Sequence, residues 1–278
     1  MEQAYTDDTE KIEIDLFLEA TYLRYGYDFR SYARASIRRR MRRILEKSGC
    51  SNVAEMIPKL LHDEKFAQSV VYEFSIPVTE MFRDPDFYLS IRKNIIPYLK
   101  TYPFIRVWHA GCASGEEVYS LAIILQEEGL YDRSTIFATD FNENVLEKAK
   151  EGIYALKDIR QYTINYQKAA GSRSFADYYH AQYESAIMNQ SLKQNITFVS
   201  HNLVTDGVFG EMHLIFCRNV LIYFDKNLQN RVLGLFADSL TLGGFLCLGS
   251  KESMHFSTVA ERFKIIDEKA RIYQKHII

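Results

Sequence analysis

Two adjacent carboxylates follow a glycine turn in the stretch HAGCASGEEVYSLA, residues 109–122. The turn comes after an apolar run and before a helical pattern, an arrangement that lets backbone approach a ligand. A phosphate-binding loop would offer a lysine or bare amides, whereas this loop offers Glu116 and Glu117. Carboxylates also suit the dipole of a first helical turn, so an ordinary helix start is the competing explanation. We predict a ligand contact for Glu116 and an ordinary first-turn role for Glu117.

Polar residues also follow other apolar runs in this half of the chain: Asp140, Asn202 and Asn219. In an open α/β sheet, ligands bind at the carboxyl ends of the strands. A carboxylate such as Asp140 accepts hydrogen bonds from ribose hydroxyls, which predicts an adenosine-type ligand. The dinucleotide and phosphate-loop signatures are absent, and glutamates suit a cation. S-adenosylmethionine fits these constraints because it is a phosphate-free adenosine with a positive sulfonium and amino group.

Two further segments carry candidate reactive side chains. VTEMFRDP places Thr79 and Arg83 on a connection that can cover a ligand, and CRNVLIYFD places Arg218 and Tyr223 just past a strand end. A lone arginine or tyrosine is more often a surface or interface residue, so spacing alone leaves both explanations open.

Composition narrows the class of protein. The 278 residues carry 34 Lys+Arg against 36 Asp+Glu, a formal net charge of -2, which argues against a nucleic-acid partner held by bulk charge. The four cysteines show no CxxC spacing, so neither a metal site nor a disulfide framework is predicted. The N-terminus is unlike a signal peptide, and no apolar run approaches the roughly 20 residues of a membrane span. We therefore expect a cytoplasmic protein that is not inserted in a membrane.

The first part of the chain, residues 1–84, has the pattern of an all-α domain with a linker. Helices are predicted to stop at Gly26 and Gly49, with Ser31 as an N-cap between them. Pro58 predicts a break or a new first turn. Asp84 as N-cap and the following proline predict a new helix that runs to about Leu99.

Residues 85–278 alternate short apolar strands with helical patterns and close with a strand pair, FKIIDEKARIYQKHI. This pattern predicts an α/β fold, a doubly wound, Rossmann-like methyltransferase sheet that follows the N-terminal all-α domain. Residues 155–195 do not fit the alternation. They are either a surface excursion of loops with a weak hairpin or a small β insertion that docks a partner.

The chain resembles the chemotaxis receptor methyltransferases, the CheR-type protein-glutamate O-methyltransferases. The resemblance runs from about residue 12 to the end and rests on five motifs in order: VTEMFRDPDFY, RVWHAGCASGEEVYSLA, ATDFNENVLEKA, HNL and LIFCRNVLIYFD. It implies S-adenosylmethionine as methyl donor, S-adenosylhomocysteine as product, and a glutamate carboxylate in the cytoplasmic methylation region of a bacterial chemoreceptor as acceptor.

The resemblance also assigns the site. Arg83 and Tyr223 are implied as catalytic, with Thr79 close to the methyl-transfer centre. The implied cofactor-binding residues are Thr79, Ala110, Gly111, Glu116, Asp140, Phe141, Asn202, Leu203, Asn219 and Val220. The insertion matches the place of a β subdomain that in some members binds a receptor C-terminal peptide by strand addition. Residues 160–190 match the family poorly, which leaves peptide docking open.

The run IRRRMRRILEK, residues 37–47, is rich in arginine. It is either a solvated helix face or a surface on which Arg39, Arg42 and Arg43 dock the acidic methylation region of a receptor. Two other functions compete with receptor methylation: a non-catalytic S-adenosylmethionine-binding signalling module, and a methyltransferase acting on another protein. A nucleic-acid methyltransferase is disfavoured because the strand LIFC is followed by RNV. This position has neither the proline-rich motif of amino-methylating enzymes nor the Pro-Cys nucleophile of cytosine-C5 enzymes.

Overall fold

The computed structural model describes residues 2–75 and 79–276. The chain divides into two compact units: Met1–Ile76 with Ile222–Gln229, and Pro77–Leu221 with Asn230–Ile278. We call them the helical unit and the sheet unit. Within the described residues, every helix is too short or too polar to cross a bilayer.

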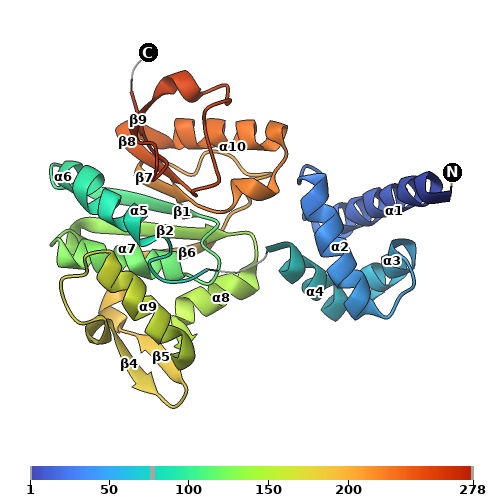
Figure 1. Ribbon diagram of the computed structural model, residues 1–278, viewed down its shortest axis with the longest axis horizontal. Coiled ribbons are helices and arrows are strands. Elements are labelled where there is room, and N and C mark those ends of the chain that lie inside the picture. The colour runs from blue at the N-terminus through green and yellow to red at the C-terminus, as the bar shows by residue number, and fades with distance from the viewer. Residues whose placement is uncertain (1, 76–78, 277–278) are drawn as a thin grey trace. The chain divides into compact units, whose positions relative to one another are not determined.

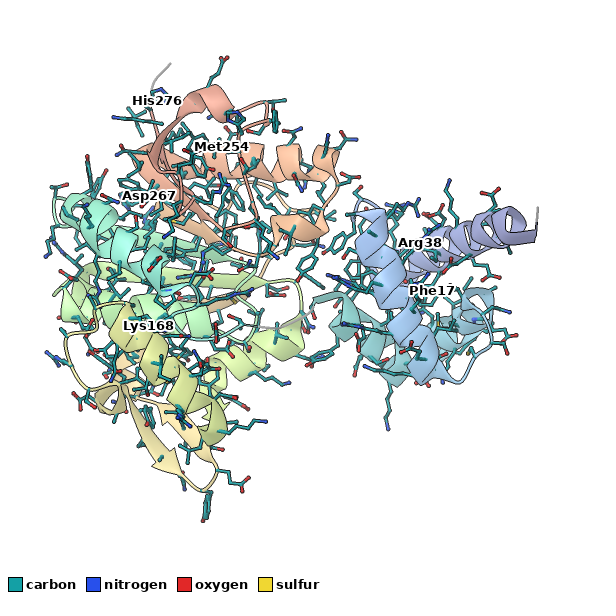
Figure 2. The ribbon with its side chains drawn as sticks, in the orientation of Figure 1. Phe17, Arg38, Lys168, Met254, Asp267 and His276 are labelled. Atoms are coloured by element: carbon teal, nitrogen blue, oxygen red, sulfur yellow. The ribbon has the colours of Figure 1, made fainter. Side chains whose placement is uncertain are left out.

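The described residues before position 76 form four helices of the helical unit: α1 Glu2–Tyr25, α2 Arg34–Ser48, α3 Val53–His62 and α4 Glu64–Ser75 (Figure 1). Their apolar faces enclose a core that includes the fully buried Phe17 (Figure 2). Gly26 and Gly49 follow α1 and α2 with φ of 78° and 74°, the left-handed conformation that glycine adopts without strain. Both predicted helix ends are confirmed.

Two predicted boundaries in this unit are wrong. Helix α2 begins at Arg34 with Ala33 at its N-cap, because the chain before it is paired as an extended segment. The amide of Ala33 donates to the carbonyl of Tyr223 at 2.8 Å, and that of Asp225 donates to the carbonyl of Ser31 at 2.9 Å. Pro58 lies inside α3 rather than at a break, and the chain leaves the helix only at Asp63.

The sheet unit starts with the helix predicted after Asp84. It consists of α5 Pro85–Ser90, a π-helical turn Ile91–Ile95 and α6 Ile96–Leu99, so its end at Leu99 is confirmed. Asp84 occupies the N-cap position, but its side chain makes no capping hydrogen bond, because its φ of 58° is left-handed and its carboxylate binds Arg218 instead.

Within residues 79–276, seven strands form the main sheet, in the order β6-β2-β1-β7-β8-β10-β9. They are β1 Ile105–Ala110, β2 Ser134–Asp140, β6 Ile196–Ser200, β7 Met212–Cys217, β8 Leu240–Leu248, β9 Phe263–Asp267 and β10 Ile272–Lys275. Strands β6, β2, β1, β7 and β8 pair in parallel, and β10 runs antiparallel to β8 and β9. The predicted parallel sheet and its closing strand pair are confirmed. The strand order reverses between β1 and β7, where such sheets bind ligands.

Three helices connect these strands: α7 Glu116–Glu127, α8 Glu143–Glu151 and α10 Lys226–Ser239. In Figure 1, α5 and α7 lie on one side of the sheet and α10 on the other. Both faces of the central strands are therefore covered, which explains why β1 and β7 are almost uniformly apolar and buried.

The region that broke the alternation contains a second, antiparallel sheet in the order β3-β5-β4. Its elements are β3 Ile153–Ala155, α9 Leu156–Lys168, β4 Tyr179–Gln182 and β5 Ser185–Met188. The carboxylate of Glu127 at the end of α7 anchors this sheet: it accepts hydrogen bonds from Tyr166 and, at 2.9 and 3.0 Å, from the hydroxyls of Ser172 and Tyr178. The insertion is thus an ordered part of the sheet unit.

Candidate active site

The loop after β1 brings backbone against the loop after β7. Gly111 has a φ of 77°, and a Cβ on it would lie 2.6 Å from Cγ2 of Val220. The amides of Gly111 and Cys112 both donate to the carbonyl of Thr139, at 2.8 and 2.9 Å. These contacts hold a sharp turn directly after the buried Ala110, at the point where the strand order reverses. A side chain at position 111 would collide with Val220, so this close approach of the two loops requires glycine.

Glu116 is the buried carboxylate of this loop. It is 6% exposed, and its Oε2 accepts a hydrogen bond from the Ser114 hydroxyl at 2.8 Å. Burial raises the pKa of Glu116 to about 7. In the described part of the chain, no lysine or arginine pairs with it. A buried carboxylate without a cationic partner fits the positive amino group of a ligand.

Asp140 ends β2 and is also buried. Its two carboxylate oxygens accept hydrogen bonds from the amides of Ala113, at 3.1 Å, and Asn142, at 3.0 Å. Burial raises the pKa of Asp140 to about 6, so it is mostly ionised at neutral pH. Each oxygen keeps a further lone pair, which suits the ribose hydroxyls of a nucleoside.

The loops after β6 and β7 complete this edge of the sheet. Oδ1 of Asn202 accepts the amide of Val204 at 2.9 Å, which fixes a tight turn beside the buried Leu203. Asn219 has a φ of 62°, and its amide donates to Glu252 at 3.0 Å. The strand ends therefore bring together the following predicted residues: Ala110, Gly111, Glu116, Asp140, Phe141, Asn202, Leu203, Asn219 and Val220.

Arg83 stands on the connection that precedes α5, in the same unit. It is partly buried, and Thr79 lies four residues before it in a segment without regular structure. Its neighbours Phe82 and Asp84 both have left-handed backbone, with φ of 54° and 58°. Such a conformation is unfavourable for residues other than glycine and must be held by contacts.

Tyr223 belongs to the helical unit. Its carbonyl pairs with Ala33, and the guanidinium of Arg40 lies 4.5 Å from the centre of its ring.

Two family models match this chain. The CheR methyltransferase all-alpha domain matches residues 12–75, and the CheR methyltransferase S-adenosylmethionine-binding domain matches residues 77–272. The chain belongs to the CheR methyltransferase family. The second model describes an S-adenosylmethionine-binding domain, and its match includes the strand ends of the main sheet. S-adenosylmethionine is therefore the cofactor of this family.

Curated relatives of this CheR-family chain extend over nearly its full length. A Pseudomonas putida KT2440 protein that bears the name methyltransferase Cher3 is 51% identical over 264 residues, covering 95% of this chain and 97% of that protein. The chemotaxis protein methyltransferase of Salmonella typhimurium LT2 is 30% identical over 250 residues, covering 88% and 84%. That of Listeria innocua is 30% identical over 231 residues, covering 82% and 85%.

Glu117, the second glutamate of the GEE motif, has a role that its sequence context does not indicate. Glu117 is paired with Arg218 at 2.8 Å, and its other oxygen lies 3.5 Å from Nδ1 of the buried His109. Burial raises the pKa of Glu117, but His109 and Arg218 outweigh burial and hold this pKa below its usual range. The prediction of an ordinary first-turn carboxylate is wrong for Glu117. Its partner lies 101 positions along the chain, so no local pattern signals the pair.

The arginine run on α2 is divided between two faces. Arg39, Arg42 and Arg43 are exposed and, with Arg38, line a hollow of about 470 Å³. Arg40 points the other way: it is fully buried, and its guanidinium donates to the carbonyl of Phe74. The helical period therefore separates a basic surface from one inward-facing arginine.

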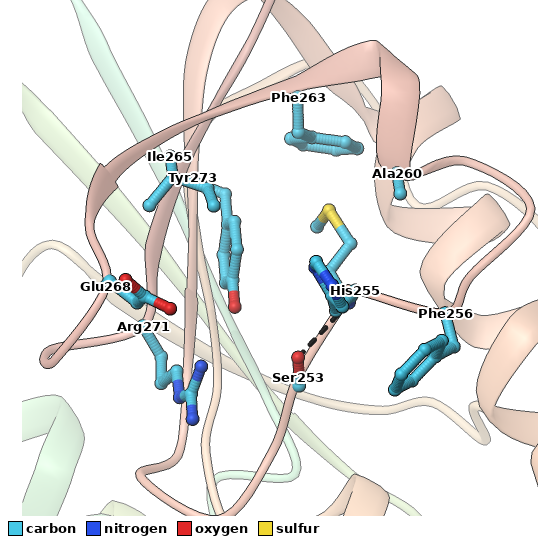
Figure 3. A pocket seen from close by; sticks show the side chains of 10 residues that line it. Ser253, His255, Phe256, Ala260, Phe263, Ile265, Glu268, Arg271 and Tyr273 are labelled. Atoms are coloured by element: carbon cyan, nitrogen blue, oxygen red, sulfur yellow. Dashed lines mark hydrogen bonds between the residues drawn. The ribbon is translucent and has the colours of Figure 1, made fainter.

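A second pocket, of about 280 Å³, lies at the C-terminal edge of the sheet (Figure 3). It is lined by the loop after β8 and by side chains of β9 and β10, including Phe263, Ile265 and Tyr273. It contains none of the predicted site residues. Over residues 2–75 and 79–276, no group of three or more His, Cys, Asp and Glu side chains is placed to hold a metal ion.

Proposed function

We propose that this chain transfers the methyl group of S-adenosylmethionine to glutamate γ-carboxylates in the cytoplasmic methylation region of bacterial chemoreceptors. The observation that supports the proposal is the buried Glu116, which has no cationic partner among the described side chains and follows the glycine turn at Gly111 after β1. The amino group of the cofactor supplies the missing positive charge. Asp140 accepts hydrogen bonds from the ribose, with Phe141 beside it. Ala110 and Gly111 line the methionine end with Glu116. The adenine and the sulfur are framed by Asn202, Leu203, Asn219 and Val220.

The acceptor needs no general base. A glutamate side chain has a reference pKa of about 4.3, so it is already a nucleophilic carboxylate at neutral pH. S-adenosylmethionine supplies an electrophilic methyl group on a positive sulfur. The enzyme must then desolvate the carboxylate and align it with the methyl–sulfur bond.

Arg83 is suited to this alignment because its planar guanidinium fixes one carboxylate geometry through two parallel donors. The grip must be stronger in the transition state than in the ground state to accelerate transfer. Thr79 lies on the same segment, close to the methyl group. Tyr223 donates a hydrogen bond to the acceptor or packs against the cofactor.

The names of the chemotaxis relatives support the acceptor, and a direct test uses the stability of the product. The chain is incubated with S-adenosylmethionine labelled in the methyl group and with receptor-bearing membranes. We expect label on the receptor that mild base releases as methanol, because a methyl ester is base-labile. Base-stable label would indicate that another acceptor atom is methylated. Label on a protein other than the receptor would indicate another substrate. Cofactor binding without any transfer would indicate a non-catalytic signalling module.

The exposed arginines of α2 support docking of an acidic receptor surface. We expect Arg39→Glu with Arg43→Glu to slow methylation of intact receptors by about 10-fold at low salt and to weaken its salt dependence, since steering by opposite charges is lost. Initial rates measured across a salt series check this. Lys65→Glu with Lys264→Glu changes the net charge equally at other exposed sites and should leave both quantities unchanged. An unaltered rate and salt profile in the arginine variant would make this surface an ordinary solvated helix face.

The insertion has an open edge that supports the binding of a receptor C-terminal peptide. Strand β4 pairs with β5 on one side and lies at the edge of its sheet, with mostly exposed side chains. An extended peptide can add to such an edge through main-chain hydrogen bonds.

A further inference from the structure

The turn that carries Arg83 is clamped on its N-terminal side by the core. Phe82 is fully buried, and its ring packs 5.1 Å from that of Tyr88 and 5.2 Å from that of Tyr166. Its amide donates to the hydroxyl of Ser120 on α7 at 2.9 Å. These contacts hold the left-handed backbone of Phe82 in place.

On the C-terminal side the turn is held by one buried arginine. Nη2 of Arg218 donates to the carboxylate of Asp84 at 2.6 Å, and Nη1 donates to Glu117 at 2.8 Å. Nη1 also lies 3.5 Å from the carbonyl oxygen of Arg83 itself. The guanidinium is 2% exposed and stacks on the ring of Phe87, with 4.0 Å between its Cζ and the ring centre.

The geometry points to Arg218 as a positioning residue: braced by Glu117, it clamps Asp84 and thereby fixes the direction in which Arg83 is presented to the acceptor carboxylate. This inference rests on the proposed role of Arg83. The three paired residues come from three different motifs. Each one is the sequence neighbour of a proposed site residue: Asp84 of Arg83, Glu117 of Glu116, and Arg218 of Asn219.

A purely structural ion pair predicts something different. If the pair only stabilised the fold, its loss would lower thermal stability without a specific effect on transfer. The side chain of Asp84 is 45% exposed, so the Asp84 end of the clamp can be altered without opening the core. Asparagine tolerates the left-handed conformation at least as well as aspartate does. Asp84→Asn therefore removes the charge and leaves the backbone preference in place.

We expect Asp84→Asn to lower kcat by about 10- to 100-fold, as a misplaced aligning group does, with the cofactor Kd and the melting temperature little changed. The sharper test is a double-mutant cycle with Arg83→Ala. If Asp84 acts through Arg83, then Asp84→Asn has no further effect once Arg83 is removed. The matched control is Asp86→Asn. Asp86 lies two residues after Asp84 and forms an exposed ion pair with Lys269, so this variant loses the same charge and should behave as wild type.

Arg218→Lys probes the other side of the clamp, since lysine keeps the charge but cannot hold two carboxylates with one planar group. A similar loss of kcat is expected. Asp84→Asn within twofold of wild type, or an additive effect in the Arg83→Ala background, would overturn the inference.

A second readout needs no acceptor. Hydrogen exchange of the peptide spanning residues 79–90 should be faster in Asp84→Asn and unchanged in Asp86→Asn. If wild-type protein fails to methylate receptors, the proposed function fails, and faster exchange in this peptide still supports the clamp. Unchanged hydrogen exchange in Asp84→Asn would contradict the clamp inference even if the wild-type protein is active.

Discussion

Arg83→Ala is expected to reduce methyl transfer by 10²-fold or more while the affinity for S-adenosylmethionine stays within about threefold, because the guanidinium acts on the acceptor and a group misplaced by about 1 Å already costs this much. Arg83→Lys should remain well below wild type, since a single ammonium does not reproduce the planar fork. Both quantities are measurable, the first by steady-state transfer to receptor membranes and the second by calorimetric titration of the cofactor.

The control for this prediction is Lys93→Ala, which removes an exposed cation from the same unit. It should leave transfer and cofactor binding unchanged. If Arg83→Ala retained transfer within a few-fold of wild type, the role of Arg83 in orienting the acceptor would be wrong, and with it the reason for clamping its turn.

The affinity for S-adenosylmethionine is expected to rise with pH up to about 7, the pKa to which burial raises Glu116. The sign follows from linkage. A cation bound beside Glu116 stabilises the ionised form and lowers its pKa, so binding below pH 7 releases a proton and is opposed by acid. Above the pKa of the ligand's amino group, about 7.7–8.0, the ligand loses its charge and the affinity should fall again.

Glu116→Gln isolates this effect. We expect it to weaken binding by about 10- to 100-fold at pH 7.5, the worth of a buried hydrogen bond to a charged group. It should also remove most of the rise between pH 6 and pH 7 and leave only the part that comes from Asp140, whose pKa is raised to about 6. Titrations in buffers of different ionisation enthalpy would detect the released proton in wild type and its absence in the variant. Glu147→Gln, a change at an exposed carboxylate on α8, serves as the control. A pH profile that Glu116→Gln leaves intact would exclude Glu116 as the cation site.

Local sequence patterns were sufficient to predict most of the elements and the strand-end positions of several candidate site residues. Continuous apolar runs predicted the strands of the parallel sheet, and glycines predicted the ends of α1 and α2. Polar residues directly after those runs predicted the strand-end positions of Asp140 and Asn219. These predictions succeeded because strand alternation, capping and the carboxyl-end rule depend on residues a few positions apart.

Tertiary structure decided which of two similar residues faces which partner. Glu116 and Glu117 are neighbours in sequence, yet one is left without a cation among the described side chains and the other is paired with Arg218. In the same way, Arg40 turns into the core while Arg39 faces solvent. Such differences arise because successive helical positions are rotated by about 100°, so the packing around each one determines its environment.

The order of the elements, the family-specific motifs and the polar residues available at each strand end follow from the amino-acid pattern alone. The three-dimensional packing was needed to show that the buried Arg218 pairs with both Asp84 and Glu117, and that Tyr223 pairs with the segment before α2. The partners in these contacts are between 101 and 190 positions apart. Their contacts depend on the order of the strands and on long-range pairing, which local periodicity does not encode.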